Sequence, residues 1–69
     1  MTTLRFFANG KAREIAAGTT VADVIAEAGL QMMQVVVEYN GEPLARDRFA
    51  QTPIAAGDRI EIAQMVGGG

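Results

Sequence analysis

The chain has 69 residues, a formal net charge of −2 and 49% hydrophobic residues, so we expect a single globular domain with a thin core. It contains no cysteine and no histidine, which excludes disulfides and zinc sites built from these residues and favours a reducing, cytoplasmic location. The acidic balance argues against nucleic-acid binding, and we expect neither a signal peptide nor a membrane-spanning segment.

The first predicted element is a β-hairpin. Residues 4–8 favour a strand, and Asn9-Gly10 is typical of a tight turn whose two central residues need positive φ. Residues 11–15 alternate weakly between polar and apolar, so we expect them to form the returning strand, which the break at Gly18 ends.

A stripe of apolar residues with helical spacing follows. Its members lie at positions i, i+3, i+4 and i+7: Val21, Val24, Ile25 and Ala28. This pattern predicts an amphipathic helix of about two and a half turns. Thr20 is placed as its N-cap with Asp23 as the capping-box partner, and Gly29 as its left-handed stop.

The middle of the chain predicts a second hairpin. Residues 35–39 are mostly β-branched and favour a strand that enters a tight turn at Asn40-Gly41. Residues 42–46 are expected to form a short return.

The last third predicts a short helix and a final strand. Asp47 is placed as the cap of a single helical turn over residues 48–50, and Pro53 argues against a central strand beside it. Residues 56–58 suit a turn. Residues 59–63 alternate strictly and therefore predict a half-buried strand.

This order of elements predicts an α+β domain in which a mixed sheet of four to five strands packs on one main helix. The residues expected to face the helix are Leu4, Phe6, Val35, Val37, Tyr39, Ile60 and Ile62. Those expected on the open face are Arg5, Phe7, Val36, Glu38, Glu61 and Ala63. An apolar strip there, made by Phe7, Val36, Ala63, Met65 and Val66, is a candidate surface for partner proteins.

The sequence has little to offer as a catalyst. Serine, histidine and cysteine are all absent, so a serine or cysteine nucleophile with a histidine base cannot exist, and Glu38 and Glu61 are expected to be solvated charges. We therefore expect a substrate of other enzymes, not an enzyme. Its reactive group would be the α-carboxylate of Gly69 at the end of a slender glycine segment, residues 67–69. The competing interpretation is a frayed terminus with no role.

An α-carboxylate is a poor acyl donor, because its pKa of about 3.3–3.7 keeps it an anion at neutral pH. Adenylation would supply a better leaving group, which sulfur or nitrogen nucleophiles could then displace. A partner enzyme would have to provide that chemistry.

Several stretches resemble the ThiS family of thiamine-pathway sulfur carriers, which are ubiquitin-like β-grasp proteins. They are residues 17–23, residues 35–42, Arg46, residues 57–62 and residues 66–69. The resemblance implies a β-grasp domain over residues 1–66 and a flexible tail over residues 67–69. It further implies that Gly69 is the modified residue, that Gly68 is its partner in the terminal pair and that Gly67 adds only flexibility.

The resemblance also implies partners. A ThiF-like enzyme would adenylate Gly69 with ATP and magnesium, cofactors that this chain would not itself bind. A cysteine desulfurase would be the indirect sulfur source, and a ThiG-like thiazole synthase would accept the sulfur from the thiocarboxylate.

Three alternatives stay open. Residues 4–8 also resemble the molybdopterin synthase small subunit, a sister sulfur carrier. The same tail suits a ubiquitin-like modifier joined to lysines of target proteins. A plain binding module that uses its sheet face is the third.

Overall fold

The computed structural model describes residues 2–65. Residue 1 and residues 66–69 lie outside the described part, so the predicted domain boundary after residue 66 and the predicted flexibility of residues 67–69 stay predictions. Within residues 2–65, no helix is long and apolar enough to cross a membrane.

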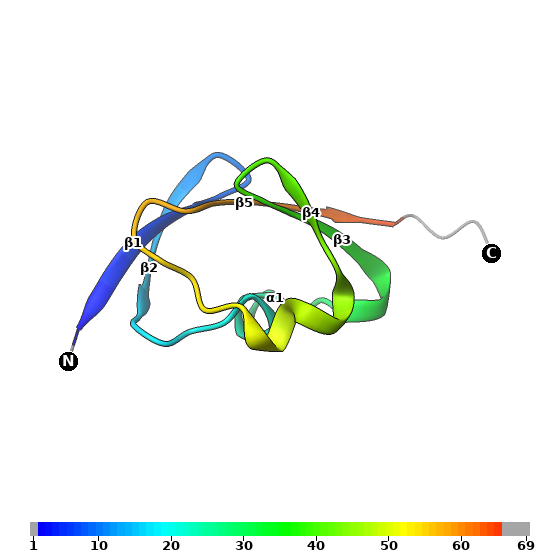
Figure 1. Cartoon of the computed structure of the whole chain (residues 1–69), viewed down its shortest axis with the longest axis horizontal. Helices are drawn as coiled ribbons and strands as arrows, with labels where there is room; N and C mark the ends of the chain where they lie inside the picture. The colour runs from blue at the N-terminus through cyan, green and yellow to red at the C-terminus, as the bar shows by residue number, and fades with distance from the viewer. Residues whose placement is uncertain (1, 66–69) are drawn as a thin grey trace.

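A five-stranded mixed sheet packs its inner face on one main helix, as Figure 1 shows. The strands are β1 (Thr3–Ala8), β2 (Lys11–Ala16), β3 (Val35–Tyr39), β4 (Glu42–Leu44) and β5 (Arg59–Gln64). Their order is β2-β1-β5-β3-β4, with β5 parallel to β1 and antiparallel to β3. The α+β, ubiquitin-like β-grasp fold predicted from the sequence is therefore confirmed.

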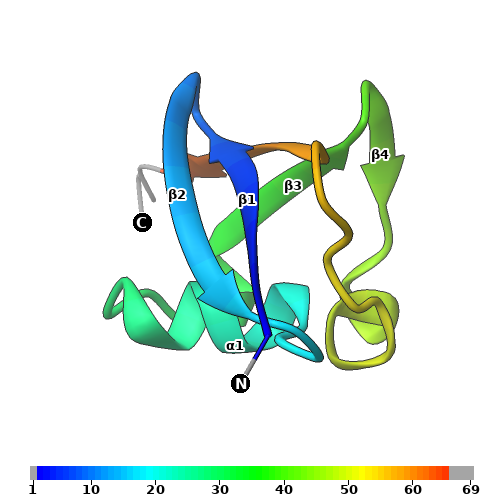
Figure 2. The same ribbon diagram turned by 90° about the vertical axis from the view of Figure 1, so that its left-hand side faces the viewer.

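Helical segments cover the inner face of the sheet and leave its outer face open (Figures 1 and 2). They are α1 (Val21–Glu27), the 3₁₀ helix η1 (Met32–Gln34) and the 3₁₀ helix η2 (Arg46–Gln51). The central strand β5 leads from the middle of the sheet to the end of the described chain (Figure 1).

Both Asn-Gly dipeptides form the predicted tight turns. Asn9 and Gly10 have φ of 51° and 82°, and Asn40 and Gly41 have φ of 53° and 87°. Asparagine and glycine tolerate this left-handed region, and two positive values in succession match the right-handed twist of the adjoining strands.

The start of α1 is fixed by a complete capping box, as predicted. The Asp23 N–H donates to Thr20 Oγ1 at 3.2 Å, and the Thr20 N–H donates to Asp23 Oδ2 at 3.0 Å. Two backbone N–H groups that the helix leaves unpaired thus find acceptors.

The end of α1 comes earlier than the apolar stripe predicted. Gly29 has φ of 77°, its N–H donates to the Ala26 carbonyl, and the Leu30 N–H donates to the Ile25 carbonyl at 3.1 Å. These two bonds form a Schellman closure around Gly29, so the left-handed stop predicted there is confirmed, and the helix itself ends at Glu27 with Ala28 as its C-cap. The prediction that Ala28 continues the buried stripe is wrong, because this closure leaves it exposed.

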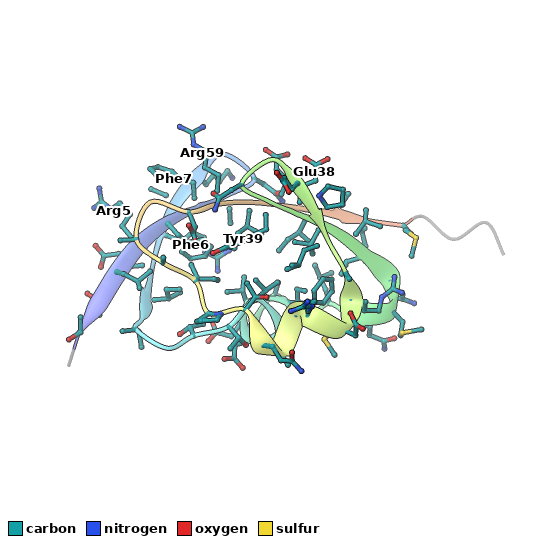
Figure 3. The ribbon with its side chains drawn as sticks, in the orientation of Figure 1. Arg5, Phe6, Phe7, Glu38, Tyr39 and Arg59 are labelled. Carbon is teal, nitrogen blue, oxygen red and sulfur yellow. The ribbon has the colours of Figure 1, made fainter. Side chains whose placement is uncertain are left out.

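The core lies between the sheet and the helical layer. Its buried apolar residues are Phe6, Ala8, Val21, Val24, Ile25, Val35, Val37, Phe49, Ile54 and Ile60. The predicted inner-face set is confirmed, with Leu4, Tyr39 and Ile62 partly buried against this cluster. Figure 3 shows Phe6 and Tyr39 directed toward the helical layer and Phe7 on the opposite side.

Residues after β4 contribute more to the core than the sequence predicted. Phe49 is 1% exposed and Ile54 is 3% exposed. The predicted capping role of Asp47 is wrong: η2 begins at Arg46, its N-cap is Ala45, and no side chain caps it. Packing stabilises η2 in place of a cap, because the buried Phe49 holds this segment against α1 and the core.

A buried carboxylate joins three segments at the start of β5. Asp58 is 9% exposed and accepts hydrogen bonds from the Tyr39 hydroxyl, the Ala55 N–H at 2.8 Å and the Asn40 side-chain amide at 3.1 Å. Burial raises the pKa of Asp58, but these three donors outweigh burial and hold its pKa below the ordinary value.

The ionisation of Tyr39 reports on its hydrogen bond to Asp58. The hydrogen bond to Asp58, together with burial and the charge of Asp58, raises the pKa of Tyr39 from 10.0 to about 12. Because the folded pKa is the higher one, the stabilisation from this group is complete below pH 10 and is lost as the pH rises toward 12.

We predict that Asp58→Asn returns the Tyr39 pKa toward 10, since it removes the anionic acceptor. The chain has one tyrosine and no tryptophan, so a tyrosinate absorbance titration reports Tyr39 alone. Circular dichroism at each pH would establish that the variant is folded, and the exposed Asp47→Asn should keep the high pKa. Equal titration midpoints for wild type and folded Asp58→Asn would contradict the assignment.

Candidate functional site

The candidate site is the open face of the sheet and the end of β5. The structure describes Phe7, Val36, Ala63 and Met65 of the predicted docking strip, whereas Val66, Gly67, Gly68 and Gly69 lie outside the described residues. The predicted roles of all these residues in partner binding or modification stay predictions.

Three residues of the predicted strip lie together where β5 ends. Val36 and Ala63 are direct cross-strand partners on β3 and β5. Met65 follows two residues after Ala63, and its N–H donates to the Gln34 carbonyl at 2.7 Å, which continues the pairing toward η1. Val36 is 52% exposed and Met65 is 47% exposed, so this end of the face presents apolar surface to solvent.

Phe7 does not join these residues, and the prediction of one continuous apolar strip is wrong. Phe7 pairs with Arg59 at the start of β5, while Ala63 lies four residues further along that strand. Glu61, paired with Glu38 on β3, interrupts the apolar surface between them. The physical reason is that alternate residues of β5 share this face, and its first two outward positions, Arg59 and Glu61, are charged.

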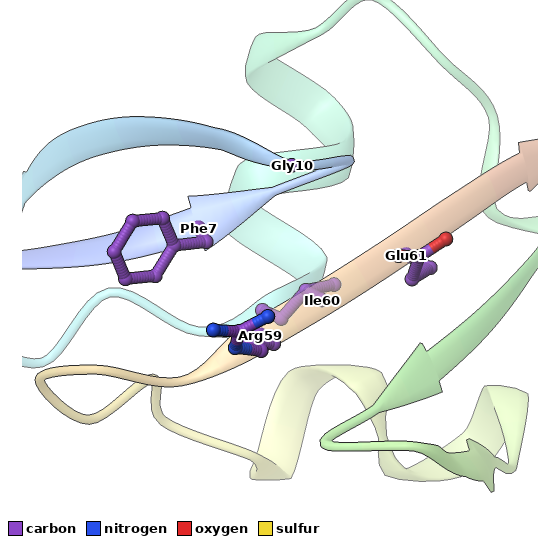
Figure 4. A pocket seen from close by; sticks show the side chains of 5 residues that line it. All are labelled: Phe7, Gly10, Arg59, Ile60 and Glu61. Atoms are coloured by element: carbon purple, nitrogen blue, oxygen red, sulfur yellow. The ribbon is translucent and has the colours of Figure 1, made fainter.

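The surroundings of Phe7 form a separate hollow of about 200 Å³, shown in Figure 4. The Arg59 guanidinium carbon lies 5.7 Å from the centre of the Phe7 ring, within the range of a cation–π contact. Phe7 is half-buried as a result, so it offers less free apolar surface than the sequence suggested.

Two further exposed methionines lie in the segment beside the end of β5. Met32 is 42% exposed and Met33 is 69% exposed, and both lie in η1 directly before β3. Because Met65 pairs with Gln34, η1 lies beside the end of β5. The sequence analysis did not single out these methionines. No local sequence pattern places η1 beside the end of β5, because this contact depends on the register of β3 and β5.

Asn9 fixes the second half of β5. Its Oδ1 accepts the Ile62 N–H at 2.8 Å, and its Nδ2 donates to the Ile62 carbonyl at 3.3 Å. The parallel backbone register of β1 and β5 covers only Phe7–Arg59 and Ala8–Ile60, so the Asn9 side chain extends the contact beyond the last paired residues.

Arg46 fixes η1 on the opposite side. Its Nε donates to the Met32 carbonyl at 2.8 Å, and its Nη2 donates to the Val35 carbonyl at 3.4 Å. Arg46 thus has a structural explanation: it supports the segment against which the end of β5 pairs. The described site therefore consists of a rigid strand end surrounded by apolar and acidic surface.

Comparisons with known proteins agree with this architecture. The sequence profile of the ThiS family matches residues 6–69. The sulfur carrier protein ThiS of Bacillus subtilis is 36% identical over 50 residues, which cover 72% of this chain and 76% of that protein. A thiazole synthase of Paramagnetospirillum magneticum is 33% identical over 66 residues, which cover 96% of this chain but only 20% of that protein.

Solved structures show the same fold. The crystal structure of a thiamine biosynthesis protein (ThiS) from Geobacter metallireducens has a TM-score of 0.79 at 32% identity and covers 96% of this chain and 100% of its own. A solution NMR structure of a thiamine biosynthesis protein from the same organism has a TM-score of 0.75 at 30% identity, covering 96% and 88%.

We predict that Asn9→Gly loosens the second half of β5 without disturbing its start. Glycine accepts the positive φ of Asn9, so the substitution removes the two side-chain bonds to Ile62 and adds no turn strain. Because the Ile62 N–H loses its hydrogen bond to Asn9 Oδ1, its hydrogen exchange with solvent should be about tenfold faster.

The matched internal control is the Arg59 amide, which donates to Asn40 Oδ1 at 2.8 Å at the other end of the strand. Residue-resolved hydrogen exchange by NMR would follow both amides in one sample. Equal acceleration of the two amides would mean a global loss of stability and would contradict a local role for Asn9.

Proposed function

The chain belongs to the ThiS family, and we propose that it is the carrier that donates sulfur for synthesis of the thiazole moiety of thiamine, with Gly69 as the residue that bears the sulfur. It acts as a covalent carrier and a substrate of partner enzymes, not as an enzyme. The observation that supports this most is the match of the family profile to residues 6–69, which spans both the β-grasp domain and the glycine segment.

In the proposed cycle, a ThiF-like enzyme uses ATP and magnesium to activate Gly69. A carboxylate oxygen attacks the α-phosphorus of ATP, diphosphate leaves, and the acyl adenylate forms. The terminal sulfur of a persulfide, generated by a cysteine desulfurase, then attacks the acyl carbon and displaces AMP. A further thiol reduces the resulting acyl disulfide and releases the thiocarboxylate.

A ThiG-like thiazole synthase is the proposed acceptor of the sulfur. Support comes from the thiazole synthase of P. magneticum. Almost all of this chain, 96%, matches that protein, but the match covers only 20% of the thiazole synthase. If the carrier passes sulfur directly to the synthase, joining the two in one chain favours the transfer, because the linkage raises the effective concentration of each for the other. We place the cycle in the cytoplasm.

The described structure suits delivery of a terminal group. The strand β5 is paired on both sides, and its end is held by Asn9 and by the backbone of Gln34. Gly68 and Gly69 have no side chains, so they can pass through a channel too narrow for other residues. The domain would thus serve as a handle, and Gly69 as the reacting end.

We predict that the protein, incubated with its adenylating enzyme, ATP, magnesium and the desulfurase system, gains the mass of sulfur in exchange for oxygen. Since the chain contains no cysteine, a thiocarboxylate is also the group expected to react with iodoacetamide. Deleting residues 68–69 should abolish both signals and leave the thermal unfolding midpoint unchanged.

The matched control is Gly67→Ala, which alters the tail but keeps the terminal pair and should still be modified. An unchanged wild-type mass, under conditions in which the B. subtilis carrier is modified, would refute the proposal. A carrier that is modified but supports molybdopterin formation and not thiazole formation would move the chain to the sister pathway.

A further inference from the structure

A groove crosses the open face of the sheet over β5, β3 and β4. Its volume is about 290 Å³, and Val36, Pro43 and Ala63 supply its apolar floor. Glu38 and Glu61 line the same groove and are direct cross-strand partners. Figure 3 shows Glu38 on the side of the sheet away from α1.

Both carboxylates are exposed, and among residues 2–65 neither forms a salt bridge with a basic side chain. Like charges directly opposite each other on a sheet repel, so this pair works against the stability of the fold. The salt bridge found within residues 2–65 joins Arg5 on β1 to Glu14 on β2, so it involves neither groove carboxylate. Arg59 shares a strand and a face with Glu61, but its guanidinium lies over the Phe7 ring (Figure 4).

Building on the proposed function, we infer that this groove receives an arginine side chain of the adenylating enzyme. An arginine can lay its aliphatic stem along apolar surface and keep its charged end outside. Its planar guanidinium presents several donors and can bind two carboxylates at once, which lysine cannot match. The groove offers both an apolar floor and two adjacent acceptors.

The chemistry of adenylation favours a cationic partner surface here. The activating site must hold the triphosphate of ATP beside the carboxylate of Gly69, and both are anions that a cationic site attracts. Gly69 lies six positions after Ala63, so covalent geometry limits their separation to about 20 Å. The acidic groove would therefore approach the cationic surroundings of the activating site when Gly69 is in place.

The test is the double variant Glu38→Gln/Glu61→Gln in the full-length chain. In ATP–diphosphate exchange with the adenylating enzyme of the same organism, its KM should rise roughly tenfold to hundredfold, with kcat unchanged. Added salt should shrink the difference from wild type, because screening weakens the wild-type contact.

The same variant should keep or raise its thermal unfolding midpoint, since it removes the repulsion between the two carboxylates. A purely structural role would move stability and affinity in the same direction, whereas the inference requires opposite directions. The matched control, Glu27→Gln/Asp47→Asn, removes two exposed charges from the helical layer and should keep the wild-type KM within about twofold.

Three outcomes would overturn the inference, and they differ in meaning. An unchanged KM for the double variant, with wild type adenylated normally, rejects the groove and leaves the carrier function intact. A higher KM confined to the thiazole synthase step shows that the occupant belongs to that enzyme instead. No exchange with wild-type protein rejects the proposed function and the groove together.

Discussion

The structure depends on how the central strand β5 is held between its two neighbours. Each Asn-Gly turn contributes an asparagine side chain to this strand: Asn40 accepts the Arg59 N–H, and Asn9 accepts the Ile62 N–H. Asp58 adds a third contact immediately before the strand, where it ties Tyr39 and Asn40 to the preceding loop. Residues far apart in sequence thus fix both the start and the end of β5 against its neighbours β1 and β3.

These contacts explain why some features were predictable and others were not. The turns, the capping box and the inner face of each strand follow from local rules of period and conformation, so the sequence predicted them. The second role of Asn9 depends on a partner 53 positions away, which no local pattern indicates. Phe49 and Ile54 were missed because their segment lacks a regular period, and their burial results from packing against α1 and the sheet.

The candidate site was also predictable from the sequence only in part. Alternation placed Val36, Ala63 and Glu61 on the open face, and the structure agrees. Alternation alone could not show that Phe7 lies at the far end of β5 or that Gln34 of η1 pairs with Met65, because both depend on strand register. The structure also shows a face that serves stability poorly, with the opposed carboxylates Glu38 and Glu61 and the exposed apolar side chains of Val36 and Met65. Such local conflicts are typical of surfaces selected for binding.

The rigidity of β5 bears directly on delivery of a terminal group to a partner. Ordering the backbone of one residue costs about 1–2 kcal/mol, and a docking reaction must supply that free energy for every residue it fixes. Residues up to Met65 are already paired in the free protein, through Asn9 on one side and Gln34 on the other. Without these contacts, the strand end from Ile62 onward would have to be ordered on docking as well. The clamps on β5 therefore favour productive encounters even though they touch no reacting atom, and they couple the stability of the fold to the function proposed for its end.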